Sequence, residues 1–200
     1  MRGYLSQLLP VKHFEDLQIP LAVVATDLVT AEMVVVTASD NQPDPAHVPD
    51  DVVVTSADLL DAICASCAIP VVFEPVKLNG RMLVDGFLTN NVPAGLTRLF
   101  GAQRVIAVDL MSDHRRRPAP RHIIEYALSA LYTYRYWSVK NRQIWADVIL
   151  KPDVLEIRRG DVIDAEGLIQ AGRQACLDAF PAIEKLLNQS LAGEDPSDAV

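Results

Sequence analysis

Short runs of consecutive apolar residues recur along the chain and are separated by polar segments. The clearest run covers residues 19–27, where apolar side chains occupy successive positions until Thr26 and Asp27. Because such a run places apolar groups on both faces, it predicts a strand that is buried on both sides. Similar runs predict further strands at residues 33–37, 104–109 and 146–150.

Helices are predicted between and after these strands, at residues 58–67, 92–100, 123–145 and 164–187. Thr55 to Asp58 resembles a capping box at the start of the first helix, and Pro70 lies just beyond its end. Asp164 is placed to cap the last helix, which Pro181 should kink or restart.

A hairpin is predicted at residues 76–85. Two short apolar stretches flank Asn79-Gly80. Asn-Gly supplies the positive φ angles that a type I′ turn requires, so the two stretches should pair as antiparallel strands.

Buried strands that alternate with helices predict an α/β fold: a mostly parallel sheet with helices on both faces. In such sheets the chemistry gathers at the carboxyl ends of the strands, where Asp27, Asp85 and Asp109 lie. Neither a repeat nor a linker divides the chain. We therefore expect one domain over residues 1–200, with a frayed tail at about 192–200.

Composition narrows the class of protein. Half of the 200 residues are apolar, and the net charge of −8 argues against a nucleic-acid-binding surface. The three cysteines are too few for a disulfide framework, which favours a reducing compartment. The N-terminus has no apolar signal segment, and no run reaches the roughly 20 residues that span a bilayer. We expect a cytoplasmic protein, with peripheral membrane contact as an alternative.

The glycine positions exclude two catalytic motifs from these 200 residues. No two glycines are four residues apart, so there is no G-x-S-x-G nucleophile elbow, and no two are two residues apart, so there is no G-x-G-x-x-G loop. Cys64 and Cys67 form a C-x-x-C without a second half for a zinc site, and we interpret them as buried helix residues. The sequence predicts neither a metal nor a cofactor.

Asp85 has the most informative surroundings. It follows an apolar strand and precedes Gly86, which permits a sharp turn. A carboxylate in this place can reach a serine on a neighbouring strand and accept its proton. Asp27 and Asp109 are explained more simply as caps of the loop or helix that follows each of them.

Several stretches, read in order, share a pattern with a known family. They are residues 19–27, 65–73, 83–86 with 91–93, 101–109 and 146–152. Across about residues 14–180 they resemble the C-terminal portion of the patatin-like phospholipase family. The resemblance implies a serine lipid acyl hydrolase, active on lipid or ester substrates, with a Ser–Asp dyad and no histidine. It also implies that Asp85 is the dyad acid, in the family's D-G-G/A motif, and that Gly86 is part of the active-site loop.

The chain departs from the family pattern in two ways. The family's oxyanion loop and G-x-S-x-G serine lie N-terminal to every matching stretch and have no counterpart here. Phe87 stands where the motif has Gly or Ala. We therefore expect a patatin-like domain that is incomplete at its N-terminus, inactive and poorly stable alone, and completed by a chain that carries the missing half.

Two other interpretations stay open at the level of sequence. The chain could be a non-catalytic descendant that binds lipid or a protein partner. Alternatively, the three strand-end aspartates could hold Mg²⁺ for phosphoryl transfer, because hard cations prefer carboxylate oxygens. This last hypothesis lacks a phosphate-binding loop.

Overall fold

The computed structural model describes residues 1–43, 48, 52–110, 119–141, 144–154 and 164–189. Its strands are β1 (Ala22–Asp27), β2 (Met33–Thr37), β3 (Val53–Val54), β4 (Val76–Leu78), β5 (Arg81–Asp85), β6 (Ile106–Val108) and β7 (Val148–Leu150). Its α-helices are α1 (Arg2–Leu8), α2 (Leu59–Ser66), α3 (Ala94–Leu99), α4 (Ile123–Asn141) and α5 (Ala165–Asn188). Two 3₁₀ helices are η1 (Phe14–Asp16) and η3 (Gly86–Leu88). Each predicted strand and helix has a counterpart.

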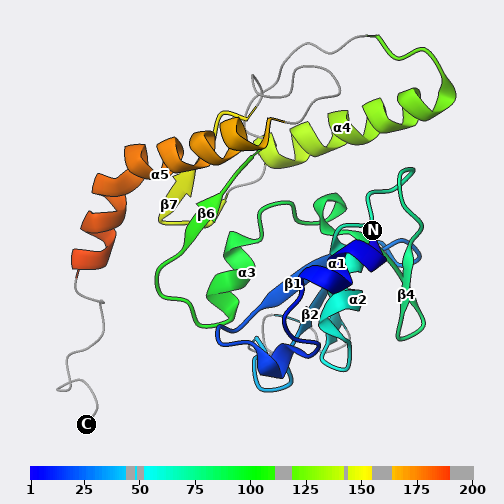
Figure 1. Ribbon diagram of the computed structural model, residues 1–200, viewed down its shortest axis with the longest axis horizontal. Helices are drawn as coiled ribbons and strands as arrows, with labels where there is room; N and C mark the ends of the chain where they lie inside the picture. The colour runs from blue at the N-terminus through cyan, green and yellow to red at the C-terminus, as the bar shows by residue number, and fades with distance from the viewer. Residues whose placement is uncertain (44–47, 49–51, 111–118, 142–143, 155–163, 190–200) are drawn as a thin grey trace.

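The strands form two separate sheets. The larger has the order β3-β2-β1-β5-β4, and the smaller pairs β6 with β7. Figure 1 shows the smaller sheet in one layer with α4 and α5, while the larger sheet lies in the other layer with α1, α2 and α3.

The prediction of a mostly parallel sheet is wrong, because the larger sheet is mixed. β1 pairs antiparallel with both β2 and β5, and β4 pairs antiparallel with β5. The β1–β2 connection, residues 28–32, is too short for the crossover that a parallel pair needs. Only β2–β3 and β6–β7 are parallel within the described residues. The prediction of an α/β fold with helices on both faces holds for this mixed sheet.

The predicted hairpin is confirmed, including its turn type. Asn79 has a φ of 48° and Gly80 a φ of 77°, as a type I′ turn requires. The turn sets the register of β4 against β5, in which Leu78 pairs with Arg81 and Val76 with Leu83. The start of β5 is thereby fixed, and with it the position of Asp85 at its end.

Each face of the larger sheet is covered by a different helix. On one face Ala25 and Leu83 pack with Ala62 and Ala65 of α2. On the other face Val24 and Val35 pack with Leu96 of α3. β1 is therefore buried on both sides, as its uninterrupted apolar sequence predicts.

The predicted helix boundaries are right in part. Asp164 caps α5, since its side chain accepts a hydrogen bond from the Gly167 amide at 3.0 Å. Pro181 lies inside α5, and Figure 1 shows the helix changing direction in its second half. The predicted capping box is wrong, because Asp58 is itself the N-cap of α2 and makes no side-chain cap hydrogen bond. The predicted frayed tail lies outside the described residues.

Candidate active site

Asp85 is the last residue of β5, and both its amide and its carboxylate are hydrogen-bonded to the backbone. Its amide donates to the carbonyl of Ala68 at 3.0 Å, which ties the strand to the segment after α2. Its carboxylate accepts a hydrogen bond from the Phe87 amide at 3.0 Å and so caps η3. The side chain of Asp85 is therefore fixed in direction before any ligand binds.

The protonation of Asp85 is shifted by its surroundings. Burial raises the pKa of this carboxyl above its ordinary value, and the Phe87 amide and the Arg135 charge offset only part of that rise. A half-buried carboxylate with a raised pKa is a better proton acceptor than an exposed one. Asp85 thus has the electrostatic character of a general base.

Position 86 requires glycine because of a close contact with β1, and not because of the sharp turn that the sequence suggests. Its φ is not positive, so a left-handed turn is not what demands glycine. A Cβ at this position would instead lie 2.5 Å from the carbonyl oxygen of Val24 on β1. The loop after Asp85 therefore approaches the neighbouring strand more closely than any side chain allows.

A pair of hydroxyls joins this loop to β1. The Thr26 hydroxyl donates to the Asp85 carbonyl at 3.2 Å and lies 2.9 Å from the Thr89 hydroxyl. Thr89 in turn donates to the Gly86 carbonyl at 3.4 Å. Sequence reasoning missed Thr26 and Thr89, because only the β1–β5 register brings them together.

Helix α4 packs over the same loop. The Tyr134 hydroxyl donates to the Leu88 carbonyl at 2.5 Å, and the Arg135 guanidinium lies 5.5 Å from the centre of the Phe87 ring. Phe87, the residue that departs from the family motif, is 7% exposed. Its bulk is therefore accommodated inside the fold, between the sheet and α4.

The segment after α2 gives the site an apolar border. The side chains of Ile69, Val71, Val72 and Phe73 are all 37% exposed or more, although they follow a buried core residue, Ala68. Val71 has a φ of 72°, which a β-branched residue adopts only under strain. Strained residues of this kind cluster at functional sites.

The two cysteines of the C-x-x-C have different environments. Cys64 is buried, as predicted, but Cys67 is exposed, and both are free thiols. Burial and the nearby Asp85 charge raise the pKa of the Cys67 thiol. Cys67 therefore borders the candidate site as a neutral thiol.

The three strand-end aspartates are not brought together. Asp27 is 2% exposed and bound to Arg81 at 3.0 Å, and it accepts a hydrogen bond from the Val29 amide. Its role as a cap of the following loop is confirmed. In the part of the chain that the structure describes, no three His, Cys, Asp or Glu side chains form a metal-ligating group. Asp109 is buried in the other sheet.

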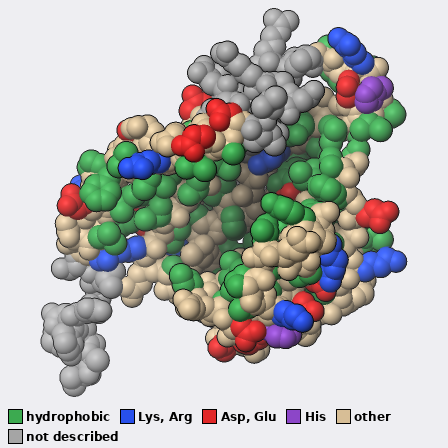
Figure 2. Space-filling model, in the orientation of Figure 1, with side chains coloured by type: hydrophobic (Ala, Val, Ile, Leu, Met, Phe, Trp, Pro, Cys, Tyr) green, Lys and Arg blue, Asp and Glu red, His purple; other side chains and the backbone are tan. Residues whose placement is uncertain are grey.

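A cavity of about 470 Å³ is lined by the end of β1 and the turn that follows it, by the end of η3 and by α4. Figure 2 shows hydrophobic side chains around a hollow between the layer of α4 and α5 and the larger sheet. Among the described helices, none has the length and hydrophobicity of a membrane span.

A fixed, half-buried carboxylate at a strand end of an α/β fold is an arrangement that acyl hydrolases use. Residues 1–98 match the family model described as patatin-like phospholipase. The matched residues contain Asp85 and its loop, so this part of the chain is similar to a family of lipid acyl hydrolases.

Individual proteins that carry a patatin-like phospholipase domain are also similar to this chain. The chain is 34% identical over 80 residues to patatin-like phospholipase domain-containing protein 6 of Mus musculus, and equally to the proteins of that name from Pongo abelii and Homo sapiens. The match covers 40% of this chain but only 5% of each relative.

Proposed function

We propose that this chain supplies Asp85 as the proton acceptor of a Ser–Asp dyad in a lipid acyl hydrolase, whose nucleophilic serine comes from polypeptide outside these 200 residues. The observation that carries the proposal is the half-buried, raised-pKa carboxylate of Asp85 within a patatin-like segment. The segment outside these residues is either part of the same polypeptide or a second chain.

The proposed chemistry has two half-reactions. In the first, Asp85 takes the serine proton while the serine oxygen bonds to the ester carbonyl carbon; the ester C–O bond then breaks, and the proton passes to the departing alcohol. In the second, Asp85 takes a proton from water, whose oxygen attacks the acyl-serine. The carboxylic acid leaves, and the serine oxygen recovers the proton.

The surface beside Asp85 supports the idea that further polypeptide completes the site. The border formed by residues 69–73 follows Ala68, whose carbonyl accepts the hydrogen bond of the Asp85 amide, and it exposes apolar side chains. Residues outside this chain would bury that border and exclude water from the dyad, which strengthens its electrostatics.

The test joins the chain in frame to a patatin-family segment that carries G-x-S-x-G. We expect the joined protein to hydrolyse p-nitrophenyl butyrate and to react with a fluorophosphonate probe at the added serine. Asp85→Asn should lower kcat by about 10²- to 10⁴-fold, the contribution of a general base. Asp178→Asn, the same change on exposed α5, is the control and should leave kcat unchanged.

Two outcomes contradict the proposal. The first is hydrolysis by the unjoined chain, with probe labelling at Ser66 or any other residue. The second is a joined Asp85→Asn protein that retains full turnover.

A second candidate function, binding of lipid or a partner without catalysis, is favoured by one contact. Arg135 stacks on Phe87 and its charge lowers the proton affinity of Asp85. A joined protein that is folded and binds substrate, but does not turn it over, would select this function over the first.

A further inference from the structure

Helix α4 carries apolar side chains on two faces, and one of these faces packs against the body of the protein. On that side Leu131 lines the cavity, and the Arg135 guanidinium lies 5.5 Å from the centre of the Phe87 ring. The second face consists of Ile123, Tyr126, Ala130 and Trp137, which we call the outer face of α4. A helix that is apolar on all sides is normally buried, so the outer face is suited to contact a further apolar surface.

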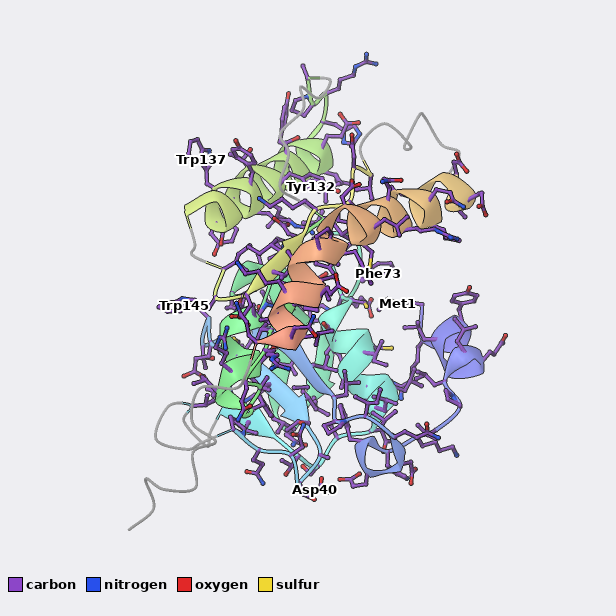
Figure 3. All side chains as sticks on the ribbon, turned by 90° about the vertical axis from the view of Figure 1, so that its left-hand side faces the viewer. Met1, Asp40, Phe73, Tyr132, Trp137 and Trp145 are labelled. Carbon is purple, nitrogen blue, oxygen red and sulfur yellow. The ribbon has the colours of Figure 1, made fainter. Side chains whose placement is uncertain are left out.

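The outer face is a continuous and exposed stripe. Its residues follow one another at intervals of three, four and seven positions, which places them on one side of an α-helix over a length of about 21 Å. Ile123, Tyr126 and Trp137 are 77%, 52% and 50% exposed, and Ala130 is also exposed. Figure 3 shows Trp137 directed away from the body.

The composition of α4 favours a lipid interface as the surface that it contacts. Four of the five tyrosines of the chain and one of its two tryptophans lie in this helix. Tyrosine and tryptophan favour the boundary between head groups and hydrocarbon, because each combines an apolar ring with a polar group that stays hydrated.

The charge around α4 has the opposite sign to that of the whole chain. Residues 113–142 contain seven lysines and arginines but two acids, whereas the net charge of the chain is −8. An anionic lipid surface therefore attracts this part of the chain and repels the rest, which turns α4 toward the lipid. A second copy docked through the same face would instead bring two basic segments together.

We propose that the outer face of α4 docks the protein on an anionic lipid bilayer, with Ile123, Tyr126 and Trp137 at the level of the head groups. The helix lies parallel to the membrane plane, as interfacial amphipathic helices do. The proposal goes beyond the Ser–Asp dyad and does not depend on it, because docking requires neither Asp85 nor turnover.

The first test measures co-sedimentation of the full chain with lipid vesicles. We expect it to bind vesicles of phosphatidylcholine mixed with phosphatidylglycerol, and to bind vesicles of phosphatidylcholine alone at least about tenfold more weakly. High salt should weaken the binding, because it screens the attraction between the basic segment and the anionic lipid.

A pair of matched double variants locates the contact. Tyr126→Ser, Trp137→Ser removes two rings from the outer face and should weaken binding to the mixed vesicles by about tenfold or more. Tyr4→Ser, Phe180→Ser removes two rings that are 68% and 56% exposed on α1 and α5, and should bind as the unchanged chain does. All four side chains are exposed, so both variants should fold, and far-UV circular dichroism checks that they do.

Tryptophan fluorescence tests the contact directly. Trp145→Phe leaves Trp137 as the only tryptophan of the chain. We expect its emission to move to shorter wavelength when mixed vesicles are added, and to be quenched when the vesicles contain brominated lipid.

Three results would overturn the proposal: no binding to the mixed vesicles, equal binding by the two double variants, and Trp137 emission that bound vesicles leave unchanged. Two other occupants of the outer face would each replace it. Without vesicle binding, self-association that the Tyr126→Ser, Trp137→Ser variant abolishes would show an interface between two copies. Without vesicle binding, protection of Trp137 from acrylamide quenching only in the joined protein would show that the completing polypeptide covers this face.

Discussion

Asp27 and Asp85 end neighbouring strands and have opposite electrostatic environments. Burial alone would raise the pKa of Asp27, but hydrogen bonds from the Val29 amide and Arg81 outweigh it and lower that pKa. The pKa of Asp85 is raised by burial, with weaker compensation. Carboxylates whose environments move their pKa values apart serve different roles. Asp27 is thereby a structural group that stays charged at neutral pH, while Asp85 is suited to exchange protons.

The ion pair of Asp27 leads to a stability prediction. Arg81→Met should lower the free energy of unfolding by about 3 kcal/mol at pH 7, because it leaves a buried carboxylate without its partner. Denaturant titration measures the change. Arg173→Met, which removes an exposed arginine of α5, is the control and should change stability by less than about 0.5 kcal/mol.

The same ion pair predicts how this difference depends on pH. The folded-state pKa of Asp27 is lowered, so its contribution is fully present above the unfolded-state pKa of about 3.9. It is lost as the pH falls through the lower folded-state value. The stability gap between the unchanged chain and Arg81→Met should therefore narrow below about pH 4. A gap that stays constant down to acid unfolding would show that Arg81 acts through packing instead.

At the scale of elements, the sequence predicts the positions of strands and helices more accurately than the direction in which the strands pair. The apolar run that becomes β1 and the Asn79-Gly80 turn are local signals, and both predicted the structure correctly. Strand direction depends on the length of connections and on which strand becomes the neighbour. The placement of β5 beside β1 is a tertiary choice, and it is what brings Thr26 to the loop of Asp85. The position of Asp85 at the end of a strand was predictable, because an apolar run, the carboxylate and a glycine are adjacent in sequence.

The close contact of the η3 loop with β1 gives a prediction at this scale. Gly86→Ala should destabilise the fold by about 1–3 kcal/mol, since the added methyl group overpacks the interface. The clash is with the backbone oxygen of Val24, 2.5 Å from the Cβ position, so rotation of a side chain cannot relieve it. Thermal or denaturant unfolding measures the effect.

A glycine-to-alanine substitution on a helix is the control that separates the packing effect at position 86 from the general effect of replacing glycine. Gly172 lies within α5, and a Cβ there would meet nothing within 4 Å. Gly172→Ala should be neutral or stabilise the protein by up to about 1 kcal/mol, because alanine favours helix. Equal effects at positions 86 and 172 would contradict the close approach of the loop to β1.

At the scale of the molecule, several described elements leave apolar and aromatic side chains exposed. Trp137 of α4 is 50% exposed and points away from the body in Figure 3. Sequence patterns predicted the apolar strands and helices, but the amount of cover that each receives depends on what packs against it.

Strand β6 is the clearest example of an element that is covered on one face only. Ala107 is buried, but its neighbours Ile106 and Val108 are 45% and 53% exposed on the opposite face. Among the described residues β6 pairs only with β7, so its exposed apolar side chains lie on an edge strand of the described sheet. Exposed apolar strands at a sheet edge promote association. We therefore expect the purified chain to associate with increasing concentration in sedimentation velocity and to bind the dye ANS.

The double variant Ile106→Thr, Val108→Thr tests whether this face causes the association. Threonine keeps the β-branched shape that suits a strand, and its hydroxyl replaces a methyl group of valine or the ethyl group of isoleucine. The variant should stay monomeric at concentrations where the unchanged chain associates, with weaker ANS fluorescence. Ile169→Thr, at a site on α5 that is 64% exposed, should associate as the unchanged chain does. A monomeric unchanged chain, or association that the double variant leaves intact, would show that the apolar face of β6 does not cause association.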